Sequence, residues 1–146
     1  MPQASHIVCP HCAALNRVPV ERSAESARCG ARHRALFDGH PAPVDEAGFE
    51  RHLHANDIPV LLDVWAPWCG PCRTMAPQFE LAAATLEPSV RLLKLNADEA
   101  PNVSARLGVR GIPALYLFRN GSVLGQTAGA MNADAIVRWA RGQLAS

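Results

Sequence analysis

The chain has 146 residues, of which 49% are hydrophobic, and this length suffices for one well-packed core and a small additional module. Its formal net charge is +1, from 14 Lys and Arg against 13 Asp and Glu, which gives no electrostatic reason to expect binding to nucleic acid or to a membrane. It has no apolar run of 18 residues, no leader-peptide pattern and an odd count of five cysteines, so we expect a cytoplasmic protein rather than a secreted, disulfide-bonded one.

Residues 1–43 are rich in cysteine and histidine and are predicted to form a separate N-terminal module. Cys9-Pro10-His11-Cys12 is followed, after sixteen residues, by Cys29-Gly30-Ala31-Arg32-His33. This spacing is close to that of a zinc ribbon, although Arg32 stands where a fourth cysteine would be. We therefore expect zinc to be bound, with these ligands: Cys9, Cys12, Cys29 and His33.

Other interpretations of this segment stay open. The metal site could have been lost, which would leave three free thiols, and Cys9 and Cys12 could then form a second redox pair. The segment has too little apolar surface to fold alone, so a metal, a disulfide or the neighbouring domain must order it. Nucleic-acid binding has only the His and Arg content in its favour, and we expect none. Residues 40–43 (His-Pro-Ala-Pro) are predicted to form a stiff linker.

From residue 44 to residue 146 the apolar pattern predicts alternating strands and helices. Strands are expected at 59–65, 90–95, 115–118 and 122–127, and helices at 45–55, from about 70 to just before Pro88, at 103–107 and at 132–144. Asn120-Gly121 predicts a tight hairpin. The order of these elements predicts an α/β domain with a mixed sheet that is covered by helices on both faces.

Trp68-Cys69-Gly70-Pro71-Cys72 lies where a buried strand runs into a helix. Thiols at i and i+3 lie on one side of the first helical turn, close enough for a disulfide. Cys69 is at the helix N-terminus, which favours the thiolate, so we expect it to face outward as the nucleophile. Cys72 is expected to face inward and to attack the mixed disulfide. Gly70 permits a tight turn, and Pro71 suits the first helical turn.

Asp63 is the one charged residue in a strand that is otherwise apolar. Burial would raise the pKa of its carboxyl group, because the ionised form loses its hydration. Asp63 could then accept the proton of Cys72, while Lys94 on a neighbouring strand would temper the shift. The alternative is that Asp63 lies at a strand edge in water.

The pentapeptide and its surroundings resemble thioredoxin over residues 44–146. Four further motifs occur in the same order: Lys94-Leu95-Asn96-Ala97-Asp98, Val109-Arg110-Gly111-Ile112-Pro113-Ala114, Arg119-Asn120-Gly121 and Gly129-Ala130. A Cys-x-x-Cys pair alone could be a zinc knuckle or two structural thiols, but neither explains these motifs. With Leu36-Phe37-Asp38-Gly39, the N-terminal segment is similar to the zinc-binding extension of the thioredoxin-2 type.

The resemblance implies a thioredoxin fold and a protein-disulfide reductase with Cys69, Cys72, Asp63 and Lys94 as catalytic residues. It implies a cis peptide bond between Ile112 and Pro113 and a flat substrate-binding rim around Cys69. The alternative to a binding rim is that Trp68 and Ile112 are apolar residues with ordinary surface exposure. The rim is expected to comprise Trp68, Gly70, Pro71, Gly111, Ile112, Pro113, Gly129 and Ala130.

The resemblance also implies partners: protein substrates that carry disulfides, and a flavoprotein thioredoxin reductase that uses NADPH. The chain has no Gly-rich nucleotide fingerprint, so we expect no bound organic cofactor, and we expect a monomer. The competing hypothesis is a zinc-dependent binding or holdase module that docks partners on a thioredoxin scaffold without turnover.

Overall fold

The computed structural model describes residues 4–19 and 24–146, so residues 1–3 and 20–23 of the predicted N-terminal module lie outside the described residues. A five-stranded sheet has the order β3-β5-β4-β6-β7. β3 and β4 run parallel to β5, whereas β6 is antiparallel to β4 and β7 is antiparallel to β6. The mixed sheet is therefore confirmed. The strands are β3 (Ala42–Val44), β4 (Val60–Trp65), β5 (Arg91–Asn96), β6 (Ala114–Arg119) and β7 (Ser122–Ala128).

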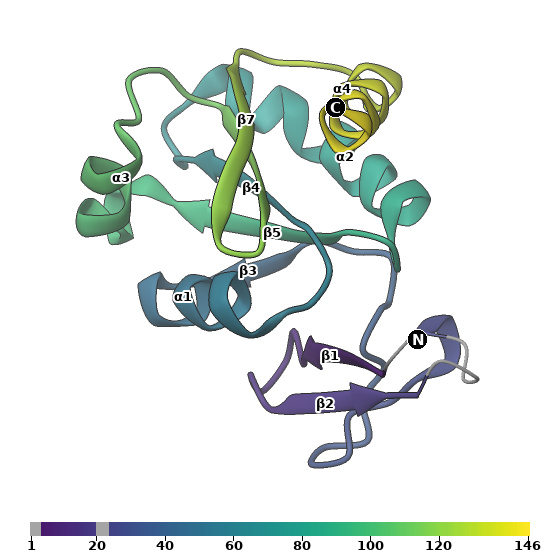
Figure 1. Ribbon diagram of the computed structural model, residues 1–146. Helices are drawn as coiled ribbons and strands as arrows, with labels where there is room; N and C mark the ends of the chain where they lie inside the picture. The colour runs from purple at the N-terminus through teal and green to yellow at the C-terminus, as the bar shows by residue number, and fades with distance from the viewer. Residues whose placement is uncertain (1–3, 20–23) are drawn as a thin grey trace.

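Helices cover both faces of this sheet (Figure 1). They are α1 (Glu46–Ala55), α2 (Gly70–Leu86), α3 (Pro101–Leu107) and α4 (Ala133–Ala145), with the short 3-10 helices η1 (Ala24–Ser26) and η2 (Ala97–Glu99). Side chains alternate along β4, so that Leu62 packs with Phe49 of α1 and Leu61 packs with Phe79 of α2. Asp63, two residues after Leu61, therefore lies on the face that α2 and α4 cover.

The predicted linker at residues 40–43 is wrong in its second half, because Ala42 and Pro43 belong to β3. Ala42 is buried and pairs with Leu93, while Pro43 is exposed opposite Lys94. β3 is an edge strand, where a proline without an N–H group removes no required ladder bond. The sheet therefore begins before residue 44.

The N-terminal segment forms a small lobe below α1 (Figure 1). Its strands β1 (Ser5–Val8) and β2 (Leu15–Val18) are antiparallel. The lobe has a small core of its own, in which the buried members are Ile7, Cys9, Val18, Ala27, Cys29, Leu36 and Phe37. It docks at the end of α1, where the Val8 N–H donates to Asn56 Oδ1 at 2.8 Å and the Asp57 N–H donates to the His6 carbonyl at 2.9 Å. The neighbouring domain thus helps to order the lobe.

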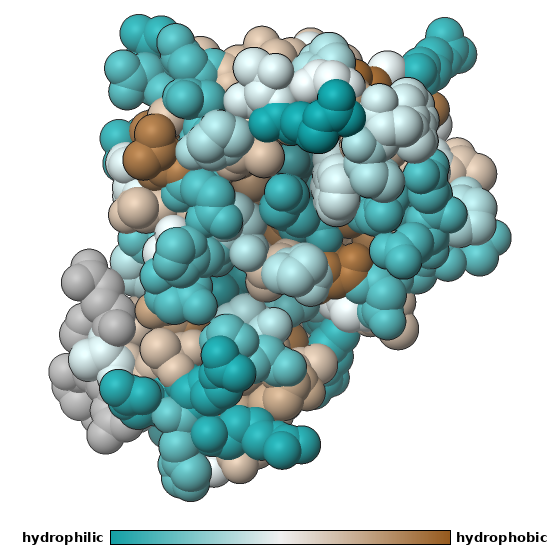
Figure 2. Space-filling view, turned by 180° about the vertical axis from the view of Figure 1, so that it is seen from behind, coloured by the Kyte–Doolittle hydropathy of each residue, from teal (hydrophilic) through white to brown (hydrophobic). Residues whose placement is uncertain are grey.

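The opposite side of the molecule is mostly hydrophilic, with hydrophobic residues in small, separate groups (Figure 2). Among residues 4–19 and 24–146, no helix combines the length and the apolar character that crossing a membrane requires.

Candidate active site and cysteine cluster

Cys69 and Cys72 lie at the junction of β4 and α2, where Cys69 is the N-cap residue of the helix. The two sulfurs are joined in a disulfide, with 5.2 Å between the Cα atoms. The backbone N–H of Cys72 donates to Cys69 Sγ at 3.2 Å. A helix N-terminus and a direct N–H donor both stabilise negative charge. After reduction, the Cys69 sulfur would therefore be favoured as a thiolate.

The active-site disulfide is nearly buried. Cys69, which we expected to face outward, is only 5% exposed, against 3% for Cys72. Cys69 Sγ lies 3.8 Å from the carbonyl oxygen of Ile112, and both cysteines pack with Ala66. The small opening at Cys69 therefore borders the loop that contains Ile112.

Asp63 is buried, with 1% exposure, on the face of the sheet that α2 covers. Its Oδ1 atom has no hydrogen-bond partner in the part of the chain that the structure describes. Desolvation raises the pKa of this carboxyl group to about 7, and the positive charge of Lys94 opposes the shift. Lys94 lies directly across from Asp63 on β5, and its Nζ sits 4.9 Å from the centre of the Trp65 ring.

Two of the expected rim residues adjoin Cys69: Ile112 packs against the cysteine pair, and Trp68 precedes Cys69 in the chain. Trp68 is 68% exposed, and its indole N–H donates to both carboxylate oxygens of Asp98 at 3.1 Å. Ile112 is half-buried, whereas Pro113, which we expected in the exposed rim, is buried, and the bond between them is cis. The Gly129 N–H donates to the Pro113 carbonyl at 2.9 Å, which ties two expected rim segments together. The remaining expected rim residues are half-buried or exposed, and they are Gly70, Pro71, Gly111, Gly129 and Ala130.

Sequence reasoning missed the role of Asp98. Its carboxylate fixes the Trp68 indole beside the disulfide from a position thirty residues later in the chain. Asp98 is the last residue of a motif that the resemblance had already singled out, and an acidic residue there could have been considered as a partner for the indole N–H.

The N-terminal lobe brings together three of its four expected metal ligands. The sulfurs of Cys9, Cys12 and Cys29 lie within 4.8 Å of one another, with 3.6 Å between Cys12 and Cys29. Tetrahedral zinc with Zn–S bonds of about 2.3 Å separates its sulfurs by about 3.8 Å. Desolvation raises the pKa of Cys29, but N–H groups of Arg32, Asn16 and neighbours outweigh it and lower the pKa to about 6. The three thiols therefore fit three corners of a zinc site.

His33, the expected fourth ligand, lies outside this cluster. The two cysteine loops have the same backbone pattern. One loop runs over five residues from Cys9 to Ala13, and the other runs over five residues from Cys29 to His33. In each, the N–H of the fifth residue donates to the cysteine carbonyl, at 3.0 Å and 2.7 Å, and that residue has a positive φ, 64° and 60°. His33 therefore matches Ala13, and Arg32 matches Cys12.

The comparisons with known proteins agree with both parts of this structure. A family model described as thioredoxin matches residues 40–142, and a model described as the N-terminal part of thioredoxin 2 matches residues 8–31. Thioredoxin C-3 from Corynebacterium nephridii is 38% identical over 138 residues, which cover 94% of each chain. The thioredoxin of Porphyra purpurea is 41% identical over 88 residues, or 60% of this chain and 82% of its own.

Among solved structures, thioredoxin f from spinach chloroplast is 31% identical, with a TM-score of 0.66, and the match covers 73% of this chain and 88% of that one. The family match includes most of the chain, and the paired cysteines lie at the N-terminus of α2. The chain therefore belongs to the thioredoxin family, in its thioredoxin-2 type, and is a thiol-disulfide oxidoreductase.

Proposed function

We propose that this oxidoreductase works as a reductant of protein disulfides and that Cys69 is its nucleophile. The observation that carries the proposal is the position of Cys69 at the N-cap of α2, where its sulfur accepts the N–H of Cys72. A thiolate stabilised in this way attacks disulfides at neutral pH. The resemblance to thioredoxin supports the same direction of reaction, because the Gly70-Pro71 dipeptide between the cysteines matches that of the reducing members of the family.

The reaction proceeds through a mixed disulfide. The Cys69 thiolate attacks one sulfur of the substrate disulfide, forms a new S–S bond and releases the other substrate sulfur as a thiolate. Cys72 then loses its proton and attacks Cys69 Sγ, which releases the second substrate thiolate and leaves the Cys69–Cys72 disulfide. Two electrons pass from the protein to the substrate.

Asp63 is the proposed acceptor of the Cys72 proton, directly or through one water. Its pKa of about 7 leaves a large share of the carboxylate ionised at neutral pH, so that it can both take and return a proton. Lys94 supports this role because its charge keeps the pKa of Asp63 from rising further.

The rim around Cys69 is the proposed substrate-binding surface. Trp68 offers an exposed aromatic face, and the backbone of the loop at Ile112 and Pro113 offers polar groups for an extended chain. Such a surface contacts the main chain of a partner more than its side chains. The proposed contact residues are Trp68, Gly70, Pro71, Gly111, Ile112, Pro113, Gly129 and Ala130.

We infer further that residues 1–43 form a zinc module beside a thioredoxin domain at 44–146, with β3 spanning the boundary. The thiolates of Cys9, Cys12 and Cys29 would hold the ion, which would supply a structural crosslink between the two loops. His33 stays the proposed fourth ligand from sequence, and its imidazole would have to move to join the sulfurs. A cytoplasmic location, and recycling by a flavoprotein thioredoxin reductase with NADPH, complete the proposal.

The test is reduction of a protein disulfide, such as those of insulin, with dithiothreitol as the electron source. We expect turnover in the parent protein and its loss, by at least about a hundredfold, in both Cys69→Ser and Cys72→Ser. Cys12→Ser is the matched control, since it removes a thiol outside the pair. Binding of reduced insulin chains without turnover in the parent protein would instead favour the holdase hypothesis.

A further inference from the structure

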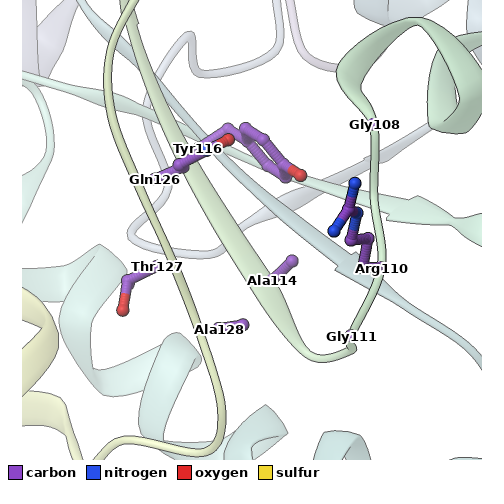
Figure 3. A pocket seen from close by; sticks show the side chains of 8 residues that line it. All are labelled: Gly108, Arg110, Gly111, Ala114, Tyr116, Gln126, Thr127 and Ala128. Carbon is purple, nitrogen blue, oxygen red and sulfur yellow. The ribbon is translucent and has the colours of Figure 1, made fainter.

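A pocket of about 530 Å³ lies between strands β6 and β7 and the loop that contains Ile112. Half of its eight lining residues are small, namely Gly108, Gly111, Ala114 and Ala128 (Figure 3). A Cβ atom added at Gly108 or Gly111 would meet no atom within 4 Å. The hollow is therefore a feature of the backbone and of small side chains, and a ligand group could enter it without displacing a neighbour.

Polar groups converge on this pocket from two sides. The guanidinium of Arg110 and the hydroxyl of Tyr116 point toward the same space, whereas Thr127 points to the other side of the sheet (Figure 3). Gln126 lies directly across from Tyr116 on the neighbouring strand, so both side chains are on the pocket face. Burial raises the pKa of Tyr116, which keeps its hydroxyl group protonated and able to donate.

The pocket is lined by one cation and by no carboxylate. Within residues 4–19 and 24–146, no ion pair or hydrogen bond occupies the Arg110 guanidinium or the Tyr116 hydroxyl. Arg110 therefore has a full set of donors available, and a guanidinium with neighbouring neutral donors is suited to a carboxylate.

The pocket is also continuous with the active site along the chain. Gly111, in its wall, precedes Ile112, whose carbonyl oxygen lies 3.8 Å from Cys69 Sγ. Ala128, on the opposite wall, precedes Gly129 of the rim. An extended segment advances about 3.3 Å per residue, so a side chain two or three residues from a bound cysteine lies about 7 to 10 Å away, a span comparable to the two residues that separate Arg110 from Ile112.

We propose that this pocket binds the carboxylate side chain of an Asp or Glu that lies two or three residues from the cysteine attacked by Cys69 in a protein substrate. Arg110 pairs with the carboxylate, and Tyr116 and Gln126 donate to it. The pocket thus adds side-chain selectivity to a rim that otherwise contacts the main chain. This inference rests on the proposed reduction of protein disulfides.

The test uses cysteine peptides whose thiol is joined in a mixed disulfide to 5-thio-2-nitrobenzoate, a chromophore released on reduction. One position at a time, two or three residues before or after the cysteine, carries Glu, Gln or Lys. We expect the reduced protein to react about fivefold faster with Glu than with Gln at one of these positions, and slowest with Lys. Added salt should lessen the preference, because Arg110 is exposed.

Arg110→Gln should bring the Glu-to-Gln rate ratio close to one, and Tyr116→Phe should lower it. Arg138→Gln removes the same charge from an exposed position on α4 and should keep the parent ratio. Equal rates with Glu and Gln peptides in an active parent protein would overturn the inference, as would a preference that survives in Arg110→Gln. Failure to reduce any of the peptides would instead overturn the proposed function.

Discussion

The carboxyl group of Asp63 is buried at a thermodynamic cost that depends on pH. Its pKa is raised from 3.8 to about 7, so between these values the folded protein holds a proton that the unfolded chain has released. The free energy of unfolding therefore falls as pH rises through this window, and the penalty is complete above pH 7. Three pKa units correspond to at most about 4 kcal/mol.

Asp63→Asn should therefore stabilise the protein by about 2 to 4 kcal/mol at pH 8 and change its stability little at pH 4, as measured by denaturant unfolding of the oxidised form. The same variant should reduce insulin at least about tenfold more slowly at pH 7, because Cys72 loses its proton acceptor. Asp134→Asn, at an exposed position in the first turn of α4, should change neither property. A stability gain that is the same at both pH values would show that Asp63 is not protonated in the fold.

The sequence was sufficient to predict the paired cysteines and the burial of Asp63, because each is visible in a short segment. A carboxyl group within an apolar strand stands out against its immediate neighbours. The contact of Trp68 with Asp98 and the burial of Arg91 depend on residues far apart in the chain, and local patterns do not specify such pairs. Arg91 begins an apolar strand, and only the docked N-terminal lobe explains why it is buried.

At the scale of elements, the two cysteine loops of the lobe have the same backbone conformation. The first loop contributes two thiols to the cluster, Cys9 and Cys12, whereas the second contributes only Cys29. Arg32 occupies the position that matches Cys12, whereas His33 matches Ala13 and lies outside the cluster. Spacing alone made His33 the obvious substitute ligand. Aligning the two loops residue by residue would have shown that His33 matches Ala13 and not Cys12, and the structure adds that both residues have a positive φ.

We expect Arg32→Cys to complete a four-thiolate site and to raise the affinity for zinc by at least about tenfold, measured by competition with a chromophoric chelator. Ala31→Cys is the matched control, since it adds a thiol one position away and should leave the affinity unchanged. Cys29→Ser should abolish binding. His33→Ala should abolish binding if the loop rearranges to bring the imidazole to the metal, and equal zinc content in His33→Ala and the parent protein would rule this ligand out.

The boundary between the lobe and the domain shows a different limit of sequence reasoning. Two prolines within four residues predict an extended linker, and the backbone of residues 42–44 is indeed extended. Whether an extended segment stays free or joins a sheet depends on the edge that it meets, in this case β5. That edge is formed fifty residues later in the chain, so no local pattern predicts the pairing.

In the whole molecule, Arg91 connects the lobe to the domain. Its side chain is 1% exposed, and its guanidinium donates to the carbonyl oxygens of Val8 at 3.2 Å and Leu36 at 2.7 Å. It also lies 4.3 Å from the centre of the Phe37 ring and pairs with Glu87 of the domain at 3.4 Å. A single buried cation thus satisfies groups from both parts of the protein.

Arg91→Met keeps the length and apolar stem of the side chain but removes all of these polar contacts. Two lobe carbonyls would lose their donor and Glu87 would lose its partner, so we expect a loss of about 3 to 5 kcal/mol from the docked state. Part of that loss is recovered if Glu87 becomes protonated, since desolvation already raises its pKa to about 7. The lobe should therefore open independently of the domain. Compared with the parent protein, Arg91→Met should accelerate deuterium exchange at the backbone amides of β1 and β2 more than at those of β4 and β5.

Arg106→Met is the appropriate comparison, because Arg106 makes an ion pair with Glu50 at the surface and such pairs contribute at most about 1 kcal/mol. It should leave the exchange of β1 and β2 unchanged. If Arg91→Met instead accelerates exchange equally in the lobe and in the sheet, the two parts unfold as one unit and Arg91 supports the stability of the whole. If it accelerates neither, the hydrogen bonds at the Asn56 side chain and the Asp57 backbone suffice to hold the lobe.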